Sequence, residues 1–164
     1  MSKSRLPVGV IALGALLSLV LAAPAAGADG ECVAGQPGVI VHIVGLKQAS
    51  GLLKVSLYGS DSRRWLAKKG RIARVKVPVT ARAMDVCLAV PAPGRYAVAV
   101  HHDLNANGDR DRQDGGGYSR NPRVGLLNPK PPFDKASFTV GSGLARVGVT
   151  LLYIHGLSVG PAQS

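Results

Sequence analysis

The chain alternates apolar and polar residues over short stretches that are separated by turn residues. Residues 52–58 (LLKVSLY) place Leu53, Val55 and Leu57 on one side and Lys54, Ser56 and Tyr58 on the other. A period of two in segments rich in β-branched residues is typical of half-buried strands. Comparable strands are predicted at residues 39–44, 71–77, 83–90, 95–101, 136–140 and 145–154.

Seven short strands with turn chemistry between them predict an all-β fold, an antiparallel β-sandwich with one long loop. The 21 glycines and 11 prolines argue against a helical bundle, because both residue types interrupt helices. The one helical candidate is a turn or two around residues 62–69. We expect one sandwich domain over residues 39–155, preceded by a segment at 29–38 and followed by a tail at 156–164.

The first 28 residues differ from the rest of the chain. A short basic stretch is followed by an uncharged apolar run at residues 6–21 and then by small residues that end in Ala26-Gly27-Ala28. This layout predicts a secretory signal peptide over residues 1–28. An uncleaved membrane anchor is the alternative, since residues 6–28 carry no charge. Pro24 and the small-residue tail favour cleavage. We therefore expect a periplasmic or secreted protein with no transmembrane segment after cleavage.

Export would make the cysteine count informative. The chain has two cysteines, Cys32 and Cys87, and an even pair in an oxidising compartment predicts a disulfide. A metal thiolate pair and a free reactive thiol are the alternatives. The sequence supports neither, because the CxxC spacing is missing and no histidine lies within a few residues of either cysteine. We expect a structural disulfide that ties residues 29–38 to the sandwich.

One stretch, residues 103–132, has no strand pattern. Its first twelve residues (DLNANGDRDRQD) carry oxygen side chains at loop positions 1, 3, 5, 9 and 12 and a glycine, Gly108, at position 6. Calcium takes six to eight oxygen ligands, and the glycine permits the sharp turn that brings alternate side chains together. The predicted ligands are Asp103, Asn105, Asn107, Asp111 and Asp114, with the backbone carbonyl of Asp109.

The calcium predicted here is structural and holds the long loop, with an affinity on the order of 10⁻⁴–10⁻³ M. The twelfth position departs from the pattern, because Asp114 is shorter than the usual glutamate. The alternative is a polar loop without an ion, in which Asn and Asp side chains bond their own backbone.

Basic residues outnumber acidic ones by 20 to 9, a formal net charge of +11. Eight of the bases gather between residues 61 and 82: Arg63, Arg64, Lys68, Lys69, Arg71, Arg74, Lys76 and Arg82. This patch predicts salt-sensitive attraction to an anionic envelope lipid or glycan. A solvated basic face is the alternative. Nucleic acid is not expected, because Trp65 alone interleaves the patch and single-strand binding uses several aromatic residues.

No catalytic constellation stands out along the chain. His101 and His102 are adjacent on a predicted strand, so they point to opposite faces and do not share one ion. Ser119 begins like a nucleophile elbow, but Asn121 stands where the motif needs glycine. An envelope enzyme with a site near His101, His102, Asp103 and Tyr118 is therefore kept as an alternative to a non-catalytic protein.

Four segments carry a resemblance to a known family: GLLKVSLY at 51–58, PGRYAVAVHHDLNANG at 93–108, GYSRN at 117–121 and FDKASF at 133–138. In them the chain resembles the exported bacterial family catalogued as domain of unknown function 2141, over residues 39–153. The resemblance implies a prealbumin-like or immunoglobulin-like β-sandwich with no established activity. The chain departs from the family pattern at residues 110–117 and 120–132. We expect an exported, non-catalytic sandwich protein of the cell envelope with a structural calcium loop.

Overall fold

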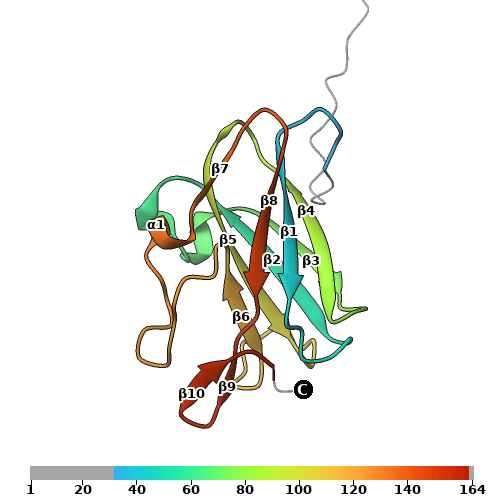
Figure 1. The fold of residues 1–164 in the computed structure, drawn as a ribbon, viewed down its shortest axis with the longest axis vertical. Coiled ribbons are helices and arrows are strands. Elements are labelled where there is room, and N and C mark those ends of the chain that lie inside the picture. Colours follow the sequence, from blue (N-terminus) through green and yellow to red (C-terminus); the bar gives the residue numbers. More distant parts are fainter. Residues whose placement is uncertain (1–31, 163–164) are drawn as a thin grey trace, which may run out of the picture.

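The computed structural model describes residues 32–162 and shows two stacked β-sheets (Figure 1). The predicted signal peptide at residues 1–28 lies outside the described residues. The smaller sheet has the strand order β4–β1–β8. Its strands are β1 (Gly38–Val44), β4 (Ala83–Ala89) and β8 (Leu144–Thr150). The predicted β-sandwich is confirmed.

The larger sheet has the order β3–β2–β5–β6, with a short strand β7 that pairs with the start of β5. Its strands are β2 (Leu52–Tyr58), β3 (Arg71–Pro78), β5 (Gly94–Asp103), β6 (Gly115–Tyr118) and β7 (Phe138–Val140). A separate hairpin consists of β9 (Tyr153–His155) and β10 (Ser158–Gly160). The helical segments are η1 (Ser62–Arg64), η2 (Lys68–Gly70) and α1 (Phe133–Ala136).

The hydrophobic core lies between the two sheets and follows the alternation seen in the sequence. Val39, Val41 and Ile43 of β1 are fully buried, and so are Leu53 and Leu57 of β2. Alternate side chains of a strand point to the same face, so each sheet contributes one apolar face to this core.

Four details differ from the sequence prediction. The first strand β1 pairs in parallel with β8, whereas the prediction was antiparallel throughout. The predicted strand at residues 145–154 is divided into β8 and β9. The strand β10 occupies part of the predicted tail at 156–164. The short helix α1 was not predicted, whereas the helical candidate at residues 62–69 is confirmed by the two 3₁₀ turns η1 and η2.

The strand β6 lies inside the stretch that was predicted to be irregular. Its sequence is GGGY, which carries no hydrophobic periodicity. A Cβ on Gly115 would lie 2.5 Å from the ring of Tyr153, and one on Gly117 would lie 2.7 Å from the carbonyl oxygen of Thr150. The chain after β8 passes so close to β6 that glycine is required at both positions.

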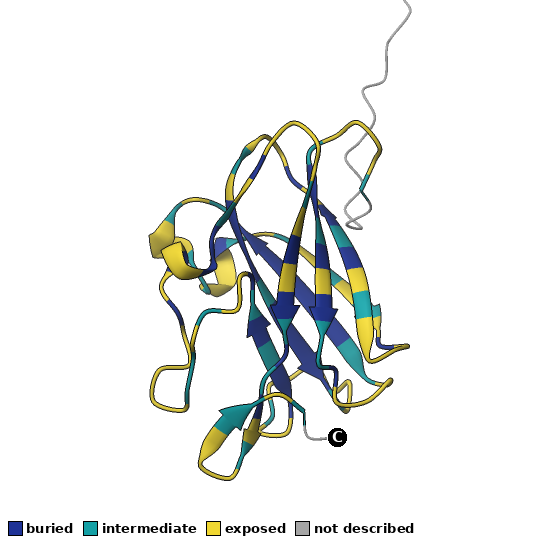
Figure 2. Ribbon diagram, viewed as in Figure 1, coloured by how far each residue is buried: buried dark blue, intermediate teal, exposed yellow. Residues whose placement is uncertain are grey.

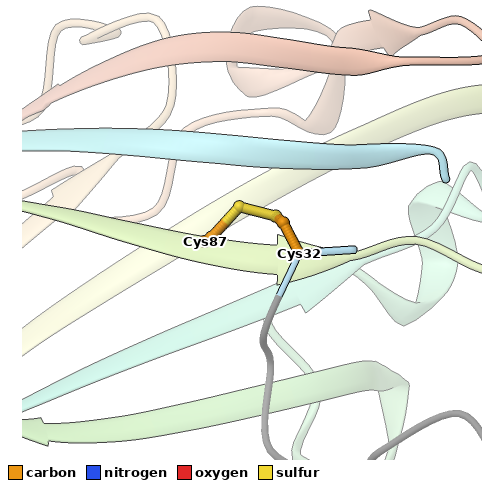
Figure 3. The surroundings of a disulfide bond; sticks show 2 residues. All are labelled: Cys32 and Cys87. Atoms are coloured by element: carbon orange, nitrogen blue, oxygen red, sulfur yellow. A yellow bond between two sulfur atoms is a disulfide. The ribbon is translucent and has the colours of Figure 1, made fainter. Parts of the chain in front are cut away.

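The disulfide joins Cys32, which precedes β1, to Cys87 on β4 (Figure 3). The two Cα atoms are 5.6 Å apart, a usual separation for such a bridge. The predicted pairing is therefore present and fastens the N-terminal segment to the smaller sheet. Among residues 32–162, no helix has the length and hydropathy needed to cross a bilayer.

Candidate functional site

A hollow of about 730 Å³ lies on the face of the larger sheet that points away from the core. Strand register places Lys54 opposite His101 and Ser56 opposite Ala99, while Gly116 of β6 lies beside His101. All five residues line the hollow. Small residues at the centre of the sheet leave space that the longer side chains around them enclose.

Two segments form the walls of the hollow. One is the irregular segment 119–132, referred to here as the proline loop, and the other is the β9–β10 hairpin. Two aromatic side chains hold the last part of the proline loop: Trp65 Nε1 donates to the carbonyl oxygen of Pro131, and Tyr118 Oη donates to that of Pro129, both at 2.8 Å. These aromatic side chains therefore fix the loop at the edge of the hollow.

Trp65 is the centre of a small aromatic cluster. Its ring meets Tyr58, Tyr118 and Phe133 edge to face, with centroid separations of 4.9, 5.9 and 6.0 Å. This cluster lies beside the hollow and is separate from the main core. The cluster links the basic segment between β2 and β3 to the proline loop.

The charged residues that line the hollow are mostly basic. Its bases are Lys54, Arg71, Arg74, Arg110 and Lys130, and its acids are Asp111 and Asp114. Within residues 32–162, Arg71, Arg74, Arg110 and Lys130 form no salt bridge. The hollow therefore holds an excess of positive charge that is open to an anionic group.

Arg74 shows that the arginines are close to one another. Burial lowers the pKa of Arg74, and the nearby charges of Arg71 and Arg110 lower it further. Its Nε donates to Ser56 Oγ at 2.9 Å, which fixes the guanidinium over the sheet. Three like charges crowded at one hollow repel each other, and a bound anion would relieve this repulsion.

A buried ion pair lies at the end of the hollow. Lys54 Nζ is 2.8 Å from Asp103 Oδ2, and the two side chains are 5% and 0% exposed. Lys54 Nζ also donates to the carbonyl oxygen of Gly108 at 2.7 Å, while the Gly108 amide donates to Asp103 Oδ2 at 2.9 Å. Burial alone raises the pKa of Asp103, but these hydrogen bonds outweigh it and hold the pKa below its usual value.

The predicted calcium ligands lie in two groups. Asp111 Oδ2 accepts hydrogen bonds from the side-chain amides of Asn105 and Asn107, both at 2.9 Å. Asp103 lies apart from them with Lys54. The side-chain oxygens of Asn105 and Asn107 instead accept the backbone amides of Asn107 and Asp109. This is the hydrogen-bonded polar loop that the sequence offered as the alternative to an ion site.

Calcium would require both asparagine amides to rotate, because the nitrogen atoms face Asp111 and only oxygen binds this ion. Asp103 Oδ1 is buried without a hydrogen-bond partner among the described residues, and a bound cation would satisfy it. No group of three or more His, Cys, Asp or Glu side chains within residues 32–162 is placed to hold a metal. Calcium binding stays a prediction.

Asp114, the last predicted ligand, is turned toward the sheet. Its Oδ2 accepts from His101 Nε2 and from the Asp111 amide, both at 2.9 Å, and its Oδ1 accepts from the Leu104 amide. Burial lowers the pKa of His101 below its usual 6.5, against the opposing influence of Asp114. The hydrogen bond from His101 fastens the end of residues 103–114, referred to here as the acidic loop, to β5.

The residues of the alternative enzyme site do not all meet. His101 and Tyr118 line the hollow, whereas Asp103 does not line it and is paired with Lys54. His102 is on the other face of β5, where it is fully buried between the Tyr153 hydroxyl at 2.8 Å and the carbonyl oxygen of Ser50 at 2.9 Å. This agrees with the prediction that the two histidines point to opposite faces.

The predicted anion-binding residues are also divided. Arg71 and Arg74 line the hollow, and the other six do not: Arg63, Arg64, Lys68, Lys69, Lys76 and Arg82. Arg63 is paired with Asp61 at 2.9 Å. Sequence reasoning missed the contributions of Lys54, Arg110 and Lys130, which come from three distant segments. No local pattern of the sequence links these three residues to Arg71 and Arg74.

Comparison with known proteins gives one match. The model of a family described as an uncharacterized protein conserved in bacteria (DUF2141) matches residues 41–147, which confirms the resemblance predicted from the sequence. The matched span contains Lys54, Asp103 and Arg74, and it ends before the β9–β10 hairpin. No curated protein and no solved structure matches the chain.

Proposed function

The chain belongs to this family of uncharacterized bacterial proteins, and from that premise we propose that it is a non-catalytic binding protein whose hollow receives the anionic group of a ligand. One observation carries the proposal: Arg71, Arg74 and Arg110 surround a single hollow, and none of them forms a salt bridge within residues 32–162. The guanidinium fork matches phosphate and carboxylate oxygens in pairs. A phosphate or carboxylate group is therefore the ligand chemistry that fits.

The hydrogen bonds of the hollow support binding over catalysis. His101 and Asp114 are used to fasten the acidic loop, and Ser56 Oγ accepts from Arg74. Lys54, which lines the hollow from β2, is fixed by Asp103 and Gly108. These groups hold the arginines and the walls in place, which favours recognition of a preformed shape.

The proposal includes export to the periplasm or the cell exterior. It rests on the signal-peptide pattern of residues 1–28 and is supported by the disulfide between Cys32 and Cys87, since such bonds persist in oxidising compartments. Isolation of the protein from cell fractions, with the N-terminus determined by mass spectrometry, tests this part. Recovery of uncleaved chain from the cytoplasm would contradict it.

Anion binding is tested by titrating the processed protein with inorganic phosphate and following Trp65 fluorescence. Trp65 is the single tryptophan and contacts Tyr58 and Tyr118, which line the hollow. Sodium chloride at equal ionic strength is the reference, because general screening acts on all surface charges. We expect a saturable change with phosphate that chloride does not reproduce.

The double variant Arg74→Gln/Arg110→Gln should bind phosphate at least about tenfold more weakly, since each charge-assisted contact contributes more than about 1 kcal/mol. Lys68→Gln/Lys69→Gln is the matched control, because it removes the same charge from exposed residues of η2 that do not line the hollow. Equal affinity in the two variants would refute the proposed site.

A further inference from the structure

Exposed apolar side chains concentrate beside the hollow. Large apolar residues that are exposed within the described chain are Val33, Ile72, Leu126, Leu127, Leu144, Ile154 and Leu157. Four of these seven lie on the proline loop and on the β9–β10 hairpin. Leu127 and Leu157 are 103% and 94% exposed, so neither packs against the protein. Two separate segments thus each present an uncovered leucine at the border of the same hollow.

The two segments lie at the same end of the sandwich. Figure 1 shows the proline loop in orange at the lower left and the hairpin in red below it, away from the first described residues at the top. Figure 2 shows that both are mostly exposed at their tips. Both contribute to the lining of the same hollow.

The lining itself has a basic part and an apolar part. Arg71, Arg74 and Arg110 come from β3 and the acidic loop. The apolar residues come from the proline loop and from residues 152–159: Val124, Leu126, Leu152, Ile154 and Val159. Lys130 is also on the proline loop, so a ligand that fills the hollow meets both positive charge and hydrocarbon.

We propose that this end of the protein docks on an anionic lipid surface, with the lipid phosphate in the basic part of the hollow and Leu127 and Leu157 in the acyl layer. The inference rests on the proposed function and identifies the ligand that carries the anionic group. The leucines gain from leaving water for hydrocarbon, and the neighbouring bases are attracted to anionic headgroups. A glycan would satisfy the arginines, but it offers no apolar phase for the leucines.

Vesicle flotation tests the proposal with the processed protein. Phosphatidylcholine vesicles are compared with vesicles that also contain phosphatidylglycerol, at low and high salt. We expect binding that depends on phosphatidylglycerol and is weakened by salt. The double variant Leu127→Ser/Leu157→Ser should bind at least about tenfold more weakly, because two leucines no longer enter the acyl layer.

Leu144→Ser is the matched control, since Leu144 is 46% exposed at the start of β8 and lies outside the hollow. It should bind vesicles like the wild type. Thermal unfolding confirms that the variants are folded. Inorganic phosphate binding should be unchanged in the leucine variant, which separates the two proposals.

Three results would overturn the inference. Wild-type vesicle binding by the leucine variant means that charge alone attracts the protein, and the anion site is left standing. Phosphate binding without any vesicle binding also removes the lipid and keeps the anion site. Vesicle binding that survives Arg74→Gln/Arg110→Gln, together with unchanged phosphate binding, refutes both proposals.

Discussion

The two sheets treat their outer faces differently. On β1 of the smaller sheet, His42 lies outward opposite Asp85, their side chains are 58% and 53% exposed, and Nδ1 and Oδ1 are 2.6 Å apart. On β2 of the larger sheet, the outward residues Lys54, Ser56 and Tyr58 are buried like the core residues between them. Figure 2 shows the difference as alternating colours along β1 and β8 and mostly dark colour along β2 and β5.

The exposed outer face of the smaller sheet shows that a sandwich forms without any cover on its outer faces. An outer face of a sandwich requires nothing beyond polar residues, and the smaller sheet has that arrangement. Covering the larger sheet with loops buries charged groups, which costs free energy unless each is paired. The cover and the buried pairs are therefore the part of the molecule that sandwich formation alone does not explain.

Breaking the buried pair should have the largest effect on stability. Lys54→Met leaves Asp103 as a buried charge without its cation, and we expect the free energy of unfolding to fall by about 3–5 kcal/mol. His42→Ala breaks the exposed pair on the other sheet and should cost less than about 1 kcal/mol. Denaturant unfolding measures both. Similar losses in the two variants would mean that the two faces are equivalent.

Opening the disulfide should weaken the smaller sheet instead. Replacing both Cys32 and Cys87 by serine should reduce the free energy of unfolding by about 2–4 kcal/mol, because the bridge restricts a 55-residue separation in the unfolded chain. Phosphate binding at the hollow should be unaffected when the protein is folded. Loss of phosphate affinity together with stability would show that the two regions are coupled.

Acid should act mainly on the covered face. Burial lowers the pKa of His101, and hydrogen bonds keep the pKa values of Asp103 and Asp114 below 3.8 although burial alone raises them. In all three the unfolded state takes up the proton first as pH falls. Stability should therefore decrease from about pH 6.5 downward and again below about pH 4, by about 1.4 kcal/mol per unit of lowered pKa.

Unfolding of wild type and His101→Gln between pH 7.5 and 5 checks the first of these steps. The step should be missing in His101→Gln and present in His42→Gln, whose histidine is on the exposed face. A pH dependence that is the same in His101→Gln and wild type would contradict the assignment.

Calcium should have the smallest effect on the free energy of unfolding. Binding of the ion would stabilise only the covered face of the larger sheet, to which the loop 103–114 belongs. With an affinity near the millimolar range, an excess of about ten over the dissociation constant stabilises the folded state by about 1.4 kcal/mol, a few degrees in Tm. Asp111→Asn should abolish the increase, because Asp111 joins Asn105 and Asn107. An unchanged Tm in calcium would identify the loop as self-sufficient.

The sequence predicts most strands because their apolar residues alternate with polar ones and lie on a single buried face. The alternation of Val39, Val41 and Ile43 and of Leu53, Val55 and Leu57 is enough to place β1 and β2. It is not enough for β6, whose glycines are required by Tyr153 and Thr150 in a distant segment. Local periodicity carries no information about a close approach of that kind.

The candidate site was only partly predictable for the same reason. Arg71 and Arg74 form part of a charge cluster in the sequence, so they were identified. The oxygen side chains at 103–114 follow a specific pattern. That pattern does not predict the ion pair between Asp103 and Lys54, because Lys54 comes from β2. The alternation of β2 predicts that Lys54 is exposed to solvent. Lys54 is buried because segments distant in the sequence cover the outer face of the sheet.

The parallel pairing of β1 with β8 also affects the order in which the sandwich is assembled during synthesis. Gly38 meets Leu144, and every residue of β1 finds its β8 neighbour roughly a hundred positions later. During synthesis from the N-terminus, β1 keeps one unpaired edge until almost all of the sandwich has been made. The last long strand therefore acts as the closure of the domain, and any shortened chain that ends before it exposes a hydrophobic edge to its neighbours.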